Sequence, residues 1–103
     1  QMEKTLKIDG RDVKFRSSGA LPILYRSLTG REYFSDMAES TKKLKSFSTE
    51  SIEDLIWVLA RCADENVPDK LTWYDSFDEF PIFSVYTDLN ELVVSSMKTT
   101  KKA

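Results

Sequence analysis

Histidine is absent from this 103-residue sequence, and cysteine occurs once, at Cys62. Without histidine the chain lacks the commonest general base and any Ser–His or Cys–His nucleophile pair. A single cysteine can form neither a structural zinc site nor an internal disulfide. Cys62 lies in the most apolar stretch of the chain, which predicts a buried structural thiol. We therefore expect no catalytic residue, no metal, no cofactor and no enzyme activity.

Long apolar runs and clustered glycines are also absent. No uninterrupted apolar run approaches the roughly 20 residues that a membrane span requires, and no stretch has the pattern of a signal peptide. The three glycines stand apart, so the sequence has no glycine-rich phosphate-binding loop. These absences predict a cytoplasmic protein without a membrane partner.

The net charge of −2 gives no general attraction to nucleic acid, but the charges are unevenly distributed. Residues 4–31 hold seven basic and two acidic residues, net +5, whereas residues 64–91 hold eight acids and one lysine, net −7. These regions either complement each other or are simply solvated within one molecule, or they form opposite flanks for head-to-tail self-association. The residues proposed for self-association are Lys4, Lys7, Arg11, Lys14 and Arg16 on one flank, and Asp75, Asp78 and Glu79 on the other.

A β-hairpin is predicted at residues 2–16, within a single domain at residues 2–97. Leu6, Ile8, Val13 and Phe15 alternate with polar neighbours and would share one face. We prefer a turn at Gly10-Arg11, which pairs Ile8 with Val13. A turn at Asp9-Gly10 is the alternative, and it leaves Ile8 opposite Arg11. The basic residues 98–103 are expected to fray.

Helical periodicity follows the hairpin. The most apolar stretch, residues 52–63, predicts a central helix that other elements must cover and that ends near Asn66, before Pro68. Ser51 and Asp54 resemble a capping box at its start. Four other helices are predicted. The first begins near Gly19 or Ala20, is capped by Ser18 and ends at Gly30, and the second runs from Arg31 to about Leu44. A short helix is capped by Thr72, and the last helix runs from about Phe83 to Met97. The predicted fold class is a mainly α, small bundle of four to five helices with an N-terminal β-hairpin.

Several side chains are assigned inward positions on these helices. They are Leu21, Leu24, Tyr25 and Leu28 in the first helix, Tyr33, Phe34, Met37 and Ala38 in the second, and Val85, Leu89, Leu92 and Val93 in the last.

Aromatic residues are concentrated in residues 73–83. Trp73, Phe77 and Phe80 can cover the central helix as part of the core. Tyr74 and Phe83 cannot easily share that face, which favours a protein-binding patch. The candidate protein-binding residues are therefore Trp73, Tyr74, Phe77, Phe80 and Phe83. Asp75, Asp78 and Glu79 could form a carboxylate pair, but a solvated helix face is favoured.

Two stretches also carry a family pattern. The first is ALPILYRSLTGREYF at residues 20–34, with Tyr-Arg-x-Leu-Thr-Gly at residues 25–30, and the second is residues 73–92, followed by Lys-Thr-Thr-Lys-Lys at residues 98–102. Together they resemble small tail assembly chaperones of bacteriophages and prophages with long, non-contractile tails. One departure is Leu92-Val93, where many relatives have tryptophan.

The resemblance implies a non-enzymatic protein of the host bacterial cytoplasm that is absent from the mature virion. Such chaperones bind the tape measure protein, keep it soluble, and promote polymerisation of the major tail protein around it, in part through a longer frameshifted form. They self-associate into rings or spirals, so a homo-oligomer is expected. The alternatives are a tail-completion or connector protein that stays in the virion, and a small regulatory binding module.

Overall fold

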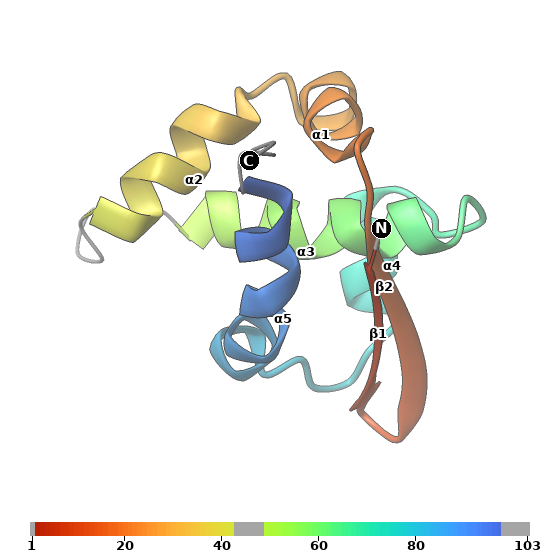
Figure 1. Ribbon diagram of the computed structural model, residues 1–103. Helices are drawn as coiled ribbons and strands as arrows, with labels where there is room; N and C mark the ends of the chain where they lie inside the picture. Colours follow the sequence, from red (N-terminus) through yellow and green to blue (C-terminus); the bar gives the residue numbers. More distant parts are fainter. Residues whose placement is uncertain (1, 43–48, 98–103) are drawn as a thin grey trace.

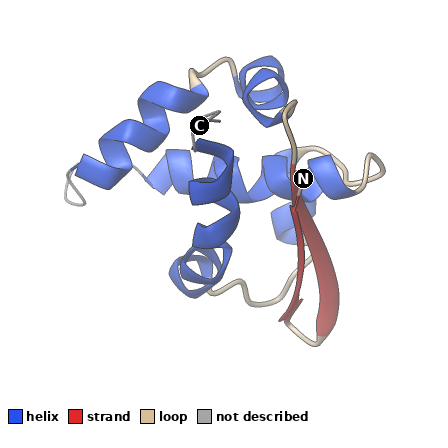
Figure 2. Cartoon of the chain, viewed as in Figure 1, coloured by secondary structure: helices blue, strands red, loops and turns tan. Residues whose placement is uncertain are grey.

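A computed structural model describes residues 2–42 and 49–97, and within them two strands and five helices. The strands are β1 (Met2–Ile8) and β2 (Arg11–Ser17), and the helices are α1 (Leu21–Thr29), α2 (Tyr33–Lys42), α3 (Thr49–Ala63), α4 (Lys70–Asp75) and α5 (Ile82–Met97). The predicted fold class, mainly helical with an N-terminal hairpin, is confirmed (Figure 2). The predicted tail at residues 98–103 lies outside the described residues.

The hairpin turns at Asp9-Gly10, so the preferred turn at Gly10-Arg11 is wrong and the alternative is correct. Asp9 and Gly10 both have positive φ, 55° and 78°, which is the requirement of a type I′ turn. Ile8 therefore pairs with Arg11, and Leu6 with Val13. Each partner differs by two residues from the preferred register, so the same side chains still face the core.

Arg11 is tolerated beside Ile8 because its charge has a partner on the inner face. Its guanidinium lies 3.8 Å from the centre of the Phe77 ring. It also donates hydrogen bonds of 3.3 Å to the backbone oxygen and the hydroxyl of Ser76. This contact is between residues 65 positions apart, so the local alternation of the hairpin gives no indication of it.

Helix α3 lies at the centre of the fold, as predicted, and β2, α1, α4 and α5 all contact it (Figure 1). Residues 54–60 of this helix are buried without interruption. The helix begins at Thr49, so the predicted capping box is wrong. Ser51 and Asp54 instead lie inside the helix as buried polar residues. The helix ends at Ala63, three residues before the predicted end at Asn66.

Helix α1 ends as predicted and begins differently. Gly30 adopts the left-handed conformation at the C-cap, with φ 76°. The N-cap is Ala20, with no side-chain cap, so the assignment of Ser18 to that position is wrong. Ser18 accepts a hydrogen bond from the backbone N–H of Ala20 instead, at 3.2 Å.

Helix α2 begins at Tyr33, two residues after the predicted start. Tyr33 and Met37 are buried as predicted, whereas Phe34 is exposed and does not face inward. The predicted end at Leu44 and the side chain of Ala38 lie outside the described part of this region.

Helix α4 is capped by Asp69 and not by Thr72. The Asp69 carboxylate accepts bonds from the Thr72 hydroxyl at 2.8 Å and the Thr72 N–H at 3.3 Å. These bonds, the hydroxyl first, lower the pKa of Asp69. Phe77 and Phe80 lie beyond the end of the helix.

Helix α5 begins one residue before the predicted start at Phe83, and its predicted inward stripe is confirmed by the burial of Val85, Leu89, Leu92 and Val93. None of the helices in the described ranges is both long and apolar enough to span a bilayer.

Candidate protein-binding site

An aromatic cluster joins the hairpin to the segment that contains α4. Trp73 is at its centre, with ring centroids 4.9 Å from Tyr74, 5.3 Å from Phe77, 5.5 Å from Phe80 and 6.4 Å from Phe15 of β2. All four pairs are edge-on, which is a favourable arrangement for aromatic rings. The cluster fixes the position of the segment after α3 against the hairpin.

Burial divides the five predicted binding residues into core and surface. Trp73 and Phe77 are buried, so the core interpretation holds for them. Tyr74 and Phe80 are half-buried, and Phe83 is 62% exposed. Only the last three have surface that a partner could contact.

A hollow of about 370 Å³ opens beside the half-buried pair. It is lined by Glu53, Lys70, Leu71, Tyr74, Phe80 and Ile82, which we call the α4 groove. Leu71 is 77% exposed at this groove, the largest fraction among the exposed large apolar side chains of the described residues. Its walls are mainly carbon, with one acid and one base.

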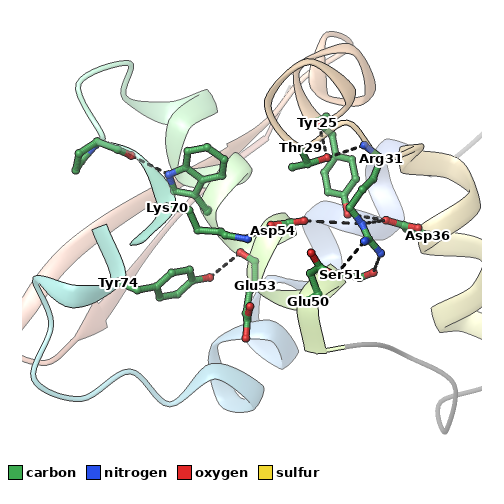
Figure 3. Close-up of polar contacts among 12 residues, drawn as sticks. Tyr25, Thr29, Arg31, Asp36, Glu50, Ser51, Glu53, Asp54, Lys70 and Tyr74 are labelled. Atoms are coloured by element: carbon green, nitrogen blue, oxygen red, sulfur yellow. Dashed lines mark hydrogen bonds and ion pairs between the residues drawn. The ribbon is translucent and has the colours of Figure 1, made fainter. Parts of the chain in front are cut away.

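The ring of Tyr74 is available for contact with a partner in the α4 groove, whereas its hydroxyl is already hydrogen-bonded. The Tyr74 hydroxyl donates a hydrogen bond of 2.7 Å to the backbone oxygen of Glu53 on α3 (Figure 3). Burial, followed by the charges of Glu53 and Asp54, raises the pKa of Tyr74. The groove can therefore hold an apolar side chain.

The sequence did not predict four of the residues that line the groove, namely Leu71, Ile82, Glu53 and Lys70. Leu71 and Ile82 do carry a signal, since both are apolar residues that belong to none of the predicted core stripes. Glu53 and Lys70 carry none, because their position depends on how α4 packs against α3.

A polar network lies behind the groove and centres on Asp54, which is 3% exposed (Figure 3). Lys70 donates a hydrogen bond of 2.5 Å to Asp54, and Arg31 lies 3.8 Å from the same carboxylate. A buried carboxylate requires such partners. Lys70 therefore links the α4 groove to the interior of the molecule.

Arg31 extends the network to α2. Its Nε donates to Asp36 at 2.8 Å and its Nη2 to the Ser51 hydroxyl at 2.7 Å. The hydrogen bond with Asp36 is the main reason that the pKa of Arg31 is raised. Tyr25 donates to the same Asp36 oxygen at 2.8 Å. Burial, followed by this hydrogen bond, raises the pKa of Tyr25.

The Tyr-Arg-x-Leu-Thr-Gly residues have structural positions at the end of α1. Tyr25 is buried against Tyr33, with ring centroids 5.4 Å apart. The Thr29 hydroxyl donates to the Tyr25 backbone oxygen at 2.7 Å and accepts from the Arg31 N–H at 3.0 Å. With Gly30 at the C-cap, the signature ends one helix and orients the next.

Cys62 is half-buried, so the prediction of a buried thiol is wrong. Arg16 on β2 lies 3.7 Å from its sulfur and donates to its backbone oxygen at 3.1 Å. This basic neighbour is 46 residues away in sequence, which is why it was not found. Both residues line an open hollow of about 710 Å³ beside α1.

The two charged flanks contact each other within one molecule. Lys4 pairs with Glu91 at 3.3 Å, and Arg11 contacts Ser76 as described. The Asp78 N–H also donates to the Asp9 carboxylate, at 2.9 Å. Of these contacts, only the Lys4–Glu91 pair joins opposite charges of the two flanks, and it supports intramolecular complementarity at that point. Head-to-tail self-association stays a prediction, with Lys14, Asp75 and Glu79 exposed.

The residues described in the structure include no group of three or more acids and cysteines arranged to hold a metal ion. Compared with protein-family models, curated protein sequences and solved structures, the chain has no match.

Proposed function

We propose that the protein is a non-enzymatic tail assembly chaperone for a bacteriophage with a long, non-contractile tail. Its partners would be the tape measure protein, which it keeps soluble in the host cytoplasm, and the major tail protein, whose polymerisation it promotes before leaving the particle. The observation that carries the proposal is the α4 groove, an exposed apolar site on a chain whose family-like residues are structural. The resemblance at residues 20–34 and 73–92 supplies the identity of the partner.

The groove suits a helical partner with an apolar stripe. Leu71, Phe80 and Ile82 provide carbon surface for side chains that repeat every three or four residues along such a helix. Asp69 and Asp75, at the two ends of α4, are exposed and favour basic residues beside that stripe. Binding of this kind covers apolar surface that would otherwise cause a long free helix to aggregate.

The proposal predicts that Leu71→Ser abolishes the solubilising effect without unfolding the protein. Leu71 is 77% exposed, so the substitution should change the free energy of unfolding by no more than about 0.5 kcal/mol. The measurement is the soluble fraction of a tape measure protein during co-expression, and the partner to test is the product of any very long helical reading frame found immediately downstream of this gene.

The matched control is Ile23→Ser, which removes an exposed apolar side chain on α1, away from the α4 groove. The Ile23 variant should keep the tape measure protein soluble. Equal behaviour of the two variants, or no effect of the wild-type chain, would contradict the proposal. Mass spectrometry of purified particles separates the alternatives, because a connector protein would be present and a chaperone absent.

A further inference from the structure

We propose that the free edge of β1 pairs with β1 of a second copy of this chain. The two strands would run antiparallel about a two-fold axis at Thr5, and would join two hairpins into one four-stranded sheet. This contact is independent of the α4 groove and of the acidic flank at residues 64–91, although Lys7 also belongs to the basic flank.

The register of the hairpin determines which backbone groups of β1 face outward. In an antiparallel hairpin with a two-residue turn, the residues beside the turn form a hydrogen-bonded pair and every second pair repeats it. Met2, Lys4, Leu6 and Ile8 therefore bond to β2. The N–H and C=O groups of Glu3, Thr5 and Lys7 point away from β2, and no hydrogen bond to them is formed by the residues that the structure describes.

The opposite edge of the sheet is less accessible. It belongs to β2, which packs along α3. Arg16 on that strand already donates to the backbone oxygen of Cys62. Helix α5 contacts both strands, and Lys4, whose side chain is on the inner face, pairs with Glu91 of that helix. The helix thus lies across the inner face of the sheet.

The charges of β1 select one arrangement of two copies. When Thr5 is opposite Thr5 of the second copy, Glu3 of each copy is opposite Lys7 of the other copy. Both pairs of opposite charge then lie on the exposed outer face. A two-fold axis at Lys7 or at Glu3 would instead oppose two like charges. The arrangement at Thr5 also gives the largest number of backbone bonds, about six.

Charged residues on an edge strand commonly prevent it from pairing with another strand, but Glu3 and Lys7 do not oppose the pairing proposed here. They are of opposite sign and equidistant from Thr5, so a symmetric contact satisfies both. Lys7 lies 3.3 Å from Asp12 in its own hairpin, but the two side chains are 68% and 69% exposed. An ion pair so exposed is weak and leaves Lys7 available to a second partner.

Charge reversal tests the register with the full-length chain. Sedimentation equilibrium of the wild type should show a concentration-dependent dimer. Glu3→Lys and Lys7→Glu should each raise its dissociation constant about tenfold, because each places two like pairs across the axis. The double variant Glu3→Lys/Lys7→Glu should recover wild-type affinity, since it exchanges the two charges.

Arg26→Glu is the matched control for Lys7→Glu. It makes the same change of charge at an exposed site of α1 and should leave the dissociation constant unchanged. Thermal unfolding of each variant verifies that the hairpin is intact.

Disulfide trapping gives a second measurement at the axis. In a Cys62→Ser background, Thr5→Cys should form a covalent dimer on oxidation, because facing residues of a hydrogen-bonded pair lie within disulfide range. Lys14→Cys should not. A wild-type chain that stays monomeric to its solubility limit, a double variant that fails to recover, or the absence of a covalent dimer in the Thr5→Cys variant would each overturn the proposal.

Discussion

Asp54 shows how one buried charge connects three parts of the molecule. Its carboxylate contacts Lys70 of α4 and Arg31 of the segment before α2, while its backbone belongs to α3. A carboxylate 3% exposed is stable only while both cations remain in place. The residue therefore orients α2 and α4 relative to the central helix, a role that hydrophobic packing alone would leave less specific.

Asp54→Ala is expected to lower the free energy of unfolding by about 2 kcal/mol. The substitution removes a buried acceptor and leaves two cations without it, and the loss is moderated because Arg31 and Lys70 reach solvent. Urea unfolding followed by circular dichroism measures the change. The control is Asp75→Ala, an exposed acid on α4, for which we expect a change within about 0.5 kcal/mol. Equal losses for the two variants would show that Asp54 has no such role.

At the scale of elements, the stability of the hairpin turn depends on the backbone conformation of Gly10. Gly10 has φ 78°, and a Cβ placed there would meet no atom within 4 Å. Gly10→Ala should cost about 1 kcal/mol, because the side chain is disfavoured by its own backbone and not by neighbours.

Gly19→Ala is the matched comparison for the turn. The space around Gly19 is equally open, and its φ is not in the left-handed region. Thermal unfolding should place this variant within about 0.5 kcal/mol of the wild type. Equal stability of the two variants would contradict a requirement for positive φ at Gly10.

Hydrophobic periodicity was sufficient to predict the strands, the helices and most of the core. The stripe from Val85 to Val93 and the apolar central helix are examples, since local spacing alone determines which face is apolar. Helix starts were predicted less well. Ser18, Ser51 and Thr72 all have the chemistry of caps, but the chain caps with Asp69 at α4 and places Ser51 inside α3.

Only part of the candidate binding site was predicted from the sequence, because the rest depends on contacts between distant segments. The aromatic run identified Tyr74 and Phe80, which line the α4 groove. It also included Trp73 and Phe77, which are buried because β2 supplies Phe15 and Arg11 from the other end of the sequence. Leu71 was missed because a single apolar residue on a six-residue helix has no periodicity to reveal it. Contacts between distant segments decide such cases.

For the molecule as a whole, two buried or half-buried tyrosines set the response to alkaline pH. Burial raises the pKa of both Tyr25 and Tyr74 above the ordinary value near 10. A raised pKa means that the folded state holds its proton more tightly than the unfolded state does. The stability from these groups is therefore complete below about pH 10 and is lost as the pH rises further.

The unfolding free energy should accordingly fall as the pH rises above about 10, and the fall should be smaller in Tyr25→Phe/Tyr74→Phe. Denaturant titrations at several pH values measure it. Absorbance of tyrosinate, compared between the wild type and the double variant, should show that Tyr25 and Tyr74 ionise only as the protein unfolds. A constant free energy across this range would contradict the effect.

The two tryptophans of the chain also lie in different surroundings, which makes them separate optical reporters. Trp57 is buried in α3, and its indole N–H donates to the backbone oxygen of Pro68 at 2.9 Å. Trp73 is ringed by aromatic side chains, two of which line the α4 groove. A Trp57→Phe variant would thus leave a single tryptophan whose emission follows occupation of that groove, so that partner binding could be titrated without attaching a dye.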